Sequence, residues 1–271
     1  MTRRWLLLPV LLLLVIGLLR LGLRNEPLRE AEWLIGSTAS LGLVMARISS
    51  AQSGLLREQL STRLLLLEPN LIPMEYRSWG LPIAPYQTGR EGWVEEADRC
   101  RLLVQSGESL NGRLELAGTE RQRPLRMEGV LRFGELEGMG DLRRISGWGL
   151  RTKTIARGAV HNRALYVVGA NFALGVDPLA QPEAWWWRDG ERWEGSAPPL
   201  PEGAPLTVTV GGIVLQVRVP TTVELDTMPQ LLTGERWVSS LLGFPPPVHD
   251  VHRVVATFDG GAVVGLLLDR R

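Results

Sequence analysis

The chain has 271 residues, of which 45% are apolar and 22% charged, and its 10 tryptophans with a net charge of +1 exclude an intrinsically disordered protein. The balance of 30 basic and 29 acidic side chains lacks the basic surplus that binding to phosphates requires, so we expect no nucleic-acid partner. The single cysteine, Cys100, excludes an intramolecular disulfide and a cysteine-based zinc site.

The first 24 residues have the pattern of a membrane anchor. Arg3 and Arg4 precede an uninterrupted apolar run over residues 5–19, and with residues 21–23 the segment is long enough for a helix to span the roughly 30 Å core of a bilayer. No small-residue cleavage site follows, which favours an uncleaved anchor over a cleaved signal peptide. Basic residues flank both ends, so charge leaves the orientation open. We expect residues 1–24 to be a single-pass helix in a bacterial inner membrane, with the domain outside the cytoplasm.

Residues 25–69 are rich in leucine and read as a helical juxtamembrane segment. The apolar stretch over residues 33–46 is too short to span a bilayer. From Ile48 to Leu67 the leucines recur near a period of 3.6, which predicts an amphipathic helix. Such a helix either packs on the domain or lies on the membrane surface.

Residues 70–271 carry the signals of a β-rich domain. Short strand-like runs recur about every ten residues, a spacing that favours an antiparallel barrel or sandwich. Two hairpins are expected, over residues 206–219 around Gly211-Gly212 and over residues 254–268 around Asp259-Gly260-Gly261. The alternation of apolar and polar residues in these runs predicts one buried and one solvated face. The stretch Arg151–Thr154, which includes Lys153, reads as polar and solvated.

A tryptophan-rich stretch over residues 185–193 is the most unusual part of the domain. A turn at Asp189-Gly190 would make it a hairpin, with Trp185 and Trp187 on one face and Trp186 on the other. Core packing explains one such face. The second face has three possible explanations: the hairpin is packed on both sides, this face forms the wall of an aromatic pocket, or it contacts a membrane interface.

The sequence offers little material for a metal or cofactor site, and we expect no cofactor. There are 3 histidines, His161, His249 and His252, and no glycine-rich phosphate loop, GxSxG or HExxH motif. His249 and His252 flank a carboxylate, but prolines precede them and a strand follows, which disfavours a helical metal site. His252 should share a strand face with Val254, either as a hydrogen-bonded core residue or at the base of a pocket.

The segments Leu125–Lys153 and Ala159–Gly195 resemble the middle of the lipocalin-like AttH and carotenoid 1,2-hydratase (hydroxyneurosporene synthase) superfamily. The resemblance covers about half of the chain and rests on the Trp148-Gly149 pair, an aromatic strand, the Asp-Gly hairpin and a glycine-rich final strand pair. It implies a calycin-like pair of barrels with an apolar cavity. In that family an Asp-His pair precedes the Trp-Gly, whereas Ile145 and Ser146 stand here, and the departure favours binding over hydration chemistry.

Three functions are compatible with these patterns. The first is a membrane-anchored, barrel-like domain that binds a hydrophobic small molecule or lipid at the bacterial envelope. Its expected ligand-binding residues are aromatic or histidine side chains: Trp148, His161, Trp185, Trp187 and His252. The second is a docking or assembly module with envelope protein partners and no ligand.

The third function is a hydratase- or hydrolase-type enzyme for an isoprenoid-like substrate. It would use His161 or His252 as general acid or base, with Asp177 or Asp250 as the partner of the histidine.

Overall fold

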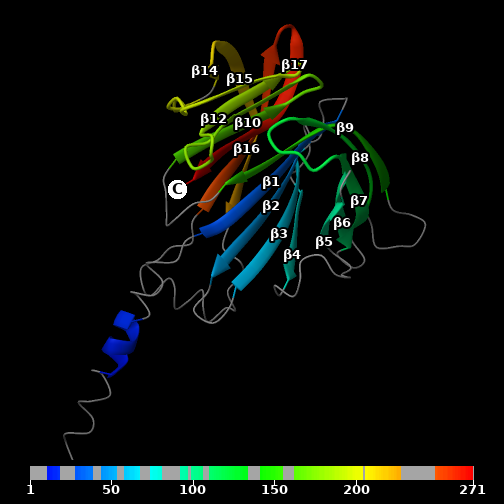
Figure 1. Cartoon of the computed structure of the whole chain (residues 1–271). Coiled ribbons are helices and arrows are strands. Elements are labelled where there is room, and N and C mark those ends of the chain that lie inside the picture. Colours follow the sequence, from blue (N-terminus) through cyan, green and yellow to red (C-terminus); the bar gives the residue numbers. More distant parts are fainter. Residues whose placement is uncertain are drawn as a thin grey trace, which may run out of the picture.

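The structure of the protein is a computed structural model. The structure describes residues 11–18, 28–38, 44–53, 58–67, 74–80, 92–96, 99–105, 110–133, 141–154, 162–203, 205–226 and 248–270. Apart from the helical residues 11–18, the elements in these ranges are strands. The expected mainly β, antiparallel architecture is confirmed, because the strands form two antiparallel sheets (Figure 1).

The N-terminal sheet has nine strands in the order β4-β3-β2-β1-β9-β8-β7-β6-β5. Its strands are β1 (Leu28–Thr38), β2 (Val44–Ser53), β3 (Glu58–Leu67), β4 (Met74–Gly80), β5 (Gly92–Glu96), β6 (Arg99–Gln105), β7 (Leu110–Ala117), β8 (Pro124–Phe133) and β9 (Asp141–Thr154). All neighbours are sequential except β1 and β9, whose antiparallel pairing joins the first four strands to the last five.

The C-terminal sheet has eight strands in the order β13-β12-β11-β10-β17-β16-β15-β14. Its strands are β10 (Asn162–Val168), β11 (Phe172–Val176), β12 (Ala184–Arg188), β13 (Glu191–Gly195), β14 (Leu206–Val210), β15 (Ile213–Asp226), β16 (Val248–Phe258) and β17 (Gly261–Arg270). The central pair β10 and β17 packs against β1 of the other sheet, and β12 approaches β14, so the C-terminal sheet curls on itself.

Two hydrophobic cores are found among the residues whose burial the structure describes. One lies between the sheets, and we call it the inter-sheet layer; its buried members are Leu67, Leu150, Ala164, Tyr166, Val168, Ala173, Trp185, Val251, Val264, Leu266 and Leu268. The other is formed by side chains of the C-terminal sheet alone, and we call it the C-terminal core. Strand β10 contributes side chains to both cores, because alternate side chains of a strand point to opposite faces. Tyr166 lies in the inter-sheet layer, and Leu165 and Val167 lie in the C-terminal core.

The hairpins expected from glycine-containing turns are all present. The β12–β13 turn has positive φ at Asp189 (48°) and Gly190 (93°), the β16–β17 turn at Asp259 (46°) and Gly260 (75°), and the β14–β15 turn at Gly211-Gly212 (53° and 84°). Two successive left-handed residues suit the right-handed twist of a tight hairpin. In β14 buried and exposed residues alternate, so the expected solvated face is confirmed there.

The prediction of a helical segment over residues 25–69 is wrong, because strands β1, β2 and β3 lie in this range. Strands β2 and β3 pair from Val44↔Leu67 to Ser53↔Glu58. The leucine pattern with a period near 3.6 ends in a run of four consecutive leucines. Such a run is also typical of a strand that is buried in a core. Pairing within the sheet therefore outweighs the helical pattern, and Leu67 is buried in the inter-sheet layer.

The predicted anchor lies mostly outside the described residues. Within it, residues 11–18 are helical. In the described part of the chain, no helix combines the length and the apolar character needed to cross a membrane.

Candidate functional site

The inter-sheet layer brings together two of the tryptophans expected to bind a ligand. Trp185 of β12 is 1% exposed and belongs to the buried cluster. Trp148 of β9 is only partly buried and packs against the same cluster from the other sheet. Large aromatic surface from both sheets therefore meets in one layer, and part of it reaches solvent at Trp148.

The position of Trp185 is set by a glycine on the neighbouring strand. Gly175 is the register partner of Trp185 in the β11–β12 pair. A Cβ atom added to Gly175 would lie 2.5 Å from Cε2 of Trp185 and 2.6 Å from its Nε1. The indole ring therefore occupies the space where a side chain would stand, which explains Trp185 by close packing.

A tyrosine and a carboxylate form a buried polar pair on the same face of the C-terminal sheet. The Tyr166 hydroxyl donates to Oδ2 of Asp177 over 2.5 Å. The backbone N–H of Leu179 donates to Oδ1 of Asp177 over 2.9 Å, and the N–H of Ala180 donates to its carbonyl over 2.9 Å. Asp177 thus fixes the turn after β11 and bonds through its carboxylate to Tyr166, a member of the inter-sheet layer.

Strand β16 adds a cation to the inter-sheet layer. Arg253 is buried and shares a face of β16 with Val251, which belongs to the inter-sheet cluster. Desolvation by burial lowers the pKa of the Arg253 guanidinium from its ordinary value. The layer is therefore apolar with a small number of polar groups set into it.

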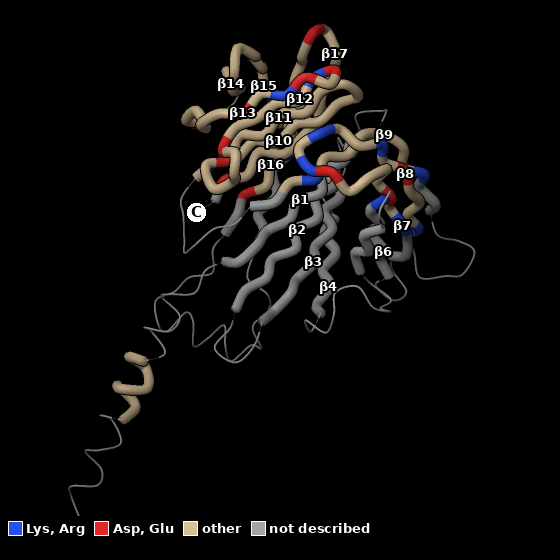
Figure 2. The backbone as a smooth tube through the Cα atoms, viewed as in Figure 1, with Lys and Arg blue, Asp and Glu red and all other residues tan. Residues whose placement is uncertain are grey.

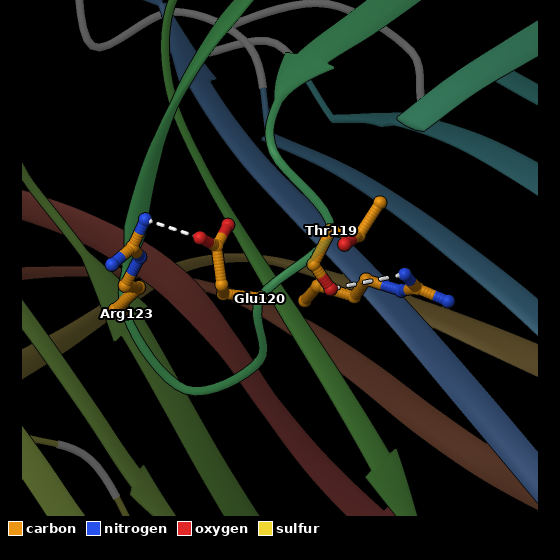
Figure 3. A network of polar contacts seen from close by, with 4 residues as sticks. Thr119, Glu120 and Arg123 are labelled. Carbon is orange, nitrogen blue, oxygen red and sulfur yellow. Dashed lines mark hydrogen bonds and ion pairs between the residues drawn. The ribbon is translucent and has the colours of Figure 1, made fainter. Parts of the chain in front are cut away.

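The end of β9 corrects the expectation that Arg151–Thr154 is solvated, because Arg151 is 1% exposed and Thr152 is 0% exposed. The Arg151 guanidinium donates from Nη1 to the carbonyl of Thr119 over 3.2 Å (Figure 3). Its own carbonyl accepts from the N–H of Gln122 over 3.0 Å. A polar sequence is buried here because the strand end is covered by the loop between β7 and β8.

This loop, residues 118–123, also reaches the other sheet, and we call it the bridging loop. Glu120 and Arg123 form an ion pair of 2.7 Å within it (Figure 3). The side-chain oxygen of Gln122 accepts from the guanidinium of Arg192 on β13. Charged residues of both signs follow the loop (Figure 2). The bridging loop thus joins the two sheets beside the end of β9.

The hairpin tips of the C-terminal sheet are held together by aromatic and charged contacts. The rings of Phe172 and Phe258 stack with centroids 4.0 Å apart, and the Arg188 guanidinium lies 5.1 Å from the Phe258 ring centroid. Arg188 also pairs with Asp259. Trp186 Nε1 donates to the carbonyl of Gly211 over 3.4 Å. These contacts hold the hairpins together at one end of the C-terminal core.

Charged side chains gather at the opposite end of the same sheet. Arg163 lies 3.7 Å from Asp269, measured from Nε to Oδ2, and donates to the carbonyl of Pro201. Asp250 is the register partner of Asp269, and His252 the partner of Leu267. These side chains share the face of the C-terminal core, because Leu267 and its strand neighbours enter that core.

The five expected ligand-binding residues therefore do not form one group. Trp148 and Trp185 meet in the inter-sheet layer, and Trp187 is half-buried on the same strand face as Trp185. His252 lies on the opposite face of the C-terminal sheet, half-buried beside the C-terminal core. His161 lies outside the described residues.

Sequence reasoning missed Tyr166 and Thr152 as polar members of the inter-sheet layer. The run over residues 164–168 reads as a buried strand, in which alternation would have placed Tyr166 opposite Leu165. The sequence predicts Asp177 only as the partner of a histidine, whereas the structure shows that it bonds to Tyr166.

No protein-family model and no curated protein matches the sequence. The arrangement of two sheets defines a class of fold that is shared with solved structures, including two of the protein CghA. The first, titled "Crystal structure of CghA", has a TM-score of 0.54 and 10% identity, and the match covers 92% of this chain and 88% of that one. The second, "Crystal structure of CghA with Sch210972", has a TM-score of 0.53 and 10% identity, with 91% and 88% covered. At this identity the similarity shows the fold alone.

Proposed function

We propose that this protein binds an apolar small molecule or lipid against Trp148 in the inter-sheet layer. The observation that carries the proposal is the meeting of partly buried Trp148 with the buried Trp185 cluster across two sheets. We further propose that residues 1–24 anchor the domain in a bacterial inner membrane with the domain outside the cytoplasm. The apolar composition of that segment supports this part.

The chemistry of the layer supports an apolar ligand. Its surface is aliphatic and aromatic, and its polar groups Tyr166 and Asp177 already bond to each other. A ligand that covers about 200 Å² of apolar surface would gain about 5 kcal/mol from the hydrophobic effect alone. Placing a charged ligand there would require removing its charge from water, and the buried guanidinium of Arg253 already takes part in another interaction.

The fold similarity supports a small molecule as the occupant. CghA, which shares this fold over 92% of the chain, has been solved together with Sch210972. A docking module is less well supported, because among the residues beyond 11–18 whose side-chain exposure the structure describes, the large exposed hydrophobic ones are Val130 and Val214, on different sheets.

The residues at the resemblance motif favour binding over hydration. Ile145 is buried and Ser146 is exposed, and neither offers an acid. Ile145 also lies on the strand face opposite to Trp148, because the two are three residues apart in β9. We therefore propose a binding protein and assign no reaction to it.

The test is native mass spectrometry of the full chain, purified in detergent from a bacterial host, with the mass of any co-purifying apolar molecule recorded. Trp148→Ala should lower the occupied fraction at least about tenfold, the effect of removing a central aromatic contact. The matched control is Trp193→Ala, which removes a half-buried tryptophan that packs on the C-terminal core. A ligand-free wild type, or equal losses in both variants, would contradict the proposal.

A further inference from the structure

The solvated face of the N-terminal sheet is basic over strands β6 to β9. Buried and exposed residues alternate in β8, and the register places the exposed residues of the neighbouring strands on the same face. The charged side chains that the structure describes on this face are Arg99, Arg113, Glu115, Arg126, Glu128, Arg132 and Arg144. Five arginines against two glutamates give the described part of this face a net charge of +3, whereas the whole chain has +1.

The two glutamates neutralise only part of this charge. The Glu115 carboxylate lies 3.0 Å from the guanidinium of Arg113 and 3.9 Å from that of Arg99, so one anion is shared by two cations. The Glu128 carboxylate lies 2.7 Å from the guanidinium of Arg126. Both pairs are at the surface, where ion pairs are weak and the cations stay accessible to a stronger anion.

An exposed valine lies among the arginines. Val130 of β8 is 40% exposed, and its register partners are Arg113 on β7 and Arg144 on β9. Arg132 follows two residues later on the same face of β8. An apolar side chain between cations suits the headgroup region of a bilayer, where guanidinium groups donate to phosphates and apolar side chains approach the acyl chains.

The hairpin tips of the C-terminal sheet carry more acidic than basic residues. The charged residues over 188–194 and at the β16–β17 turn are Arg188, Asp189, Glu191, Arg192, Glu194 and Asp259. Figure 2 shows the basic side chains along β7 and β8 and the acidic ones at the tip of the β16–β17 hairpin. An anionic surface would attract the first region and repel the second, so it would orient the domain.

A tether makes a modest attraction sufficient for docking. When residues 1–24 hold the chain in a bilayer, the domain stays at a high effective concentration beside it. Each arginine near an anionic membrane surface then raises the docked population about fivefold. An acidic protein partner would have to bind without this advantage, so the charge and the anchor together favour lipid.

We propose that the solvated face of β6 to β9 docks the domain onto an anionic bilayer, with Val130 at the headgroups and Arg132 and Arg144 bound to lipid phosphates. This inference rests on the anchoring part of the proposed function. It goes beyond that function, because it names the surface of the domain that meets the membrane and the lipid chemistry that the surface recognises.

The test is arginine-selective labelling of the full chain with phenylglyoxal, read at each arginine by mass spectrometry. The chain is placed in nanodiscs of phosphatidylcholine alone or of phosphatidylcholine mixed with phosphatidylglycerol. With phosphatidylglycerol, Arg132 and Arg144 should react at least about fivefold more slowly. Arg218 of β15 is the matched control, because it is exposed on the other sheet, and it should react equally in both.

Salt and substitution provide two further readouts. High salt should remove the protection, because the contact is electrostatic and exposed. Arg132→Gln with Arg144→Gln should abolish the protection of Arg126 on the same face, whereas Arg192→Gln with Arg218→Gln removes the same charge from the other sheet and should keep it. All four side chains are exposed, so these changes should leave the fold intact.

The outcomes separate the docking face from the anchor. A chain that enters both kinds of nanodisc but shows equal labelling of Arg132 and Arg144 refutes the docking face and leaves the anchor standing. Equal protection of Arg218 also refutes it, as does protection of this face by a co-purifying acidic protein in detergent. A chain that enters neither kind of nanodisc refutes the anchor and the docking of a tethered domain together.

Discussion

Replacing Gly175 by alanine should destabilise the protein through the ring of Trp185. The new Cβ would lie 2.5 Å from Cε2 of Trp185, closer than such atoms come in proteins. The ring has no free space to move into, because Trp185 is 1% exposed. Overpacking of this kind costs about 1–3 kcal/mol, and the lower chain entropy of alanine offsets about 0.5–1 kcal/mol of it. We expect a net loss of about 1–2 kcal/mol.

The assay is urea unfolding of the full chain in detergent, followed by tryptophan fluorescence. Gly261→Ala is the matched control, because its Cβ would meet only the carbonyl oxygen of Phe258 at 3.4 Å, and it should leave stability unchanged or slightly raised. In a Trp185→Leu background the cost of Gly175→Ala should disappear, since the clashing ring is gone. A Gly175→Ala protein as stable as the wild type would refute the packing that we assign to Trp185.

Three further changes have expected outcomes of their own. Gly211→Ala should lower the melting temperature, because Gly211 has a φ of +53° and its Cβ would lie 2.5 Å from Cδ2 of Trp193; an unchanged melting curve would contradict that contact. Tyr166→Phe should cost about 1–3 kcal/mol in urea unfolding, since it removes a donor from the buried carboxylate of Asp177, and no loss would show that another group replaces it. Arg188→Ala should change stability by less than about 1 kcal/mol, because its ion pair is exposed, and a larger loss would show that its contact with an aromatic ring is the stronger term.

The hairpins could be predicted from sequence because their turns depend on local chemistry. Asp189-Gly190 and Asp259-Gly260 both adopt the left-handed conformations that such pairs favour. The flanking runs alternate, so the buried face of β14 could be assigned correctly. Predictions of this kind succeed where the deciding interactions lie within a few residues.

The strands over residues 28–67 could not be predicted, because pairing with other strands of the sheet determines their conformation. Strand β1 pairs with β9, more than a hundred residues away, and no local pattern shows that contact. Consecutive leucines fit a helix or a buried strand equally well. The β fold of this region is therefore a property of the whole sheet.

The candidate site was predictable by residue type but not by arrangement. The sequence predicts Trp148 and Trp185 as ligand-binding residues by their large aromatic side chains, and both lie in one layer. The sequence predicts His252 from the strand face that it shares with Val254, and this face of β16 lies on the side of the sheet opposite to the two tryptophans. Thr152 stands in a polar run, and only the cover provided by the bridging loop and the second sheet shows that it is buried.

The two cores share the strands of one sheet, and this makes the length of β10 more constrained than its composition. Tyr166 serves the inter-sheet layer, and Leu165 and Val167 serve the C-terminal core. Deleting one residue before Tyr166 would exchange every side chain that follows between the faces. The tyrosine would enter the aliphatic core, and Asp177 would lose its donor. We expect this strand to accept changes of residue far more readily than changes in their number.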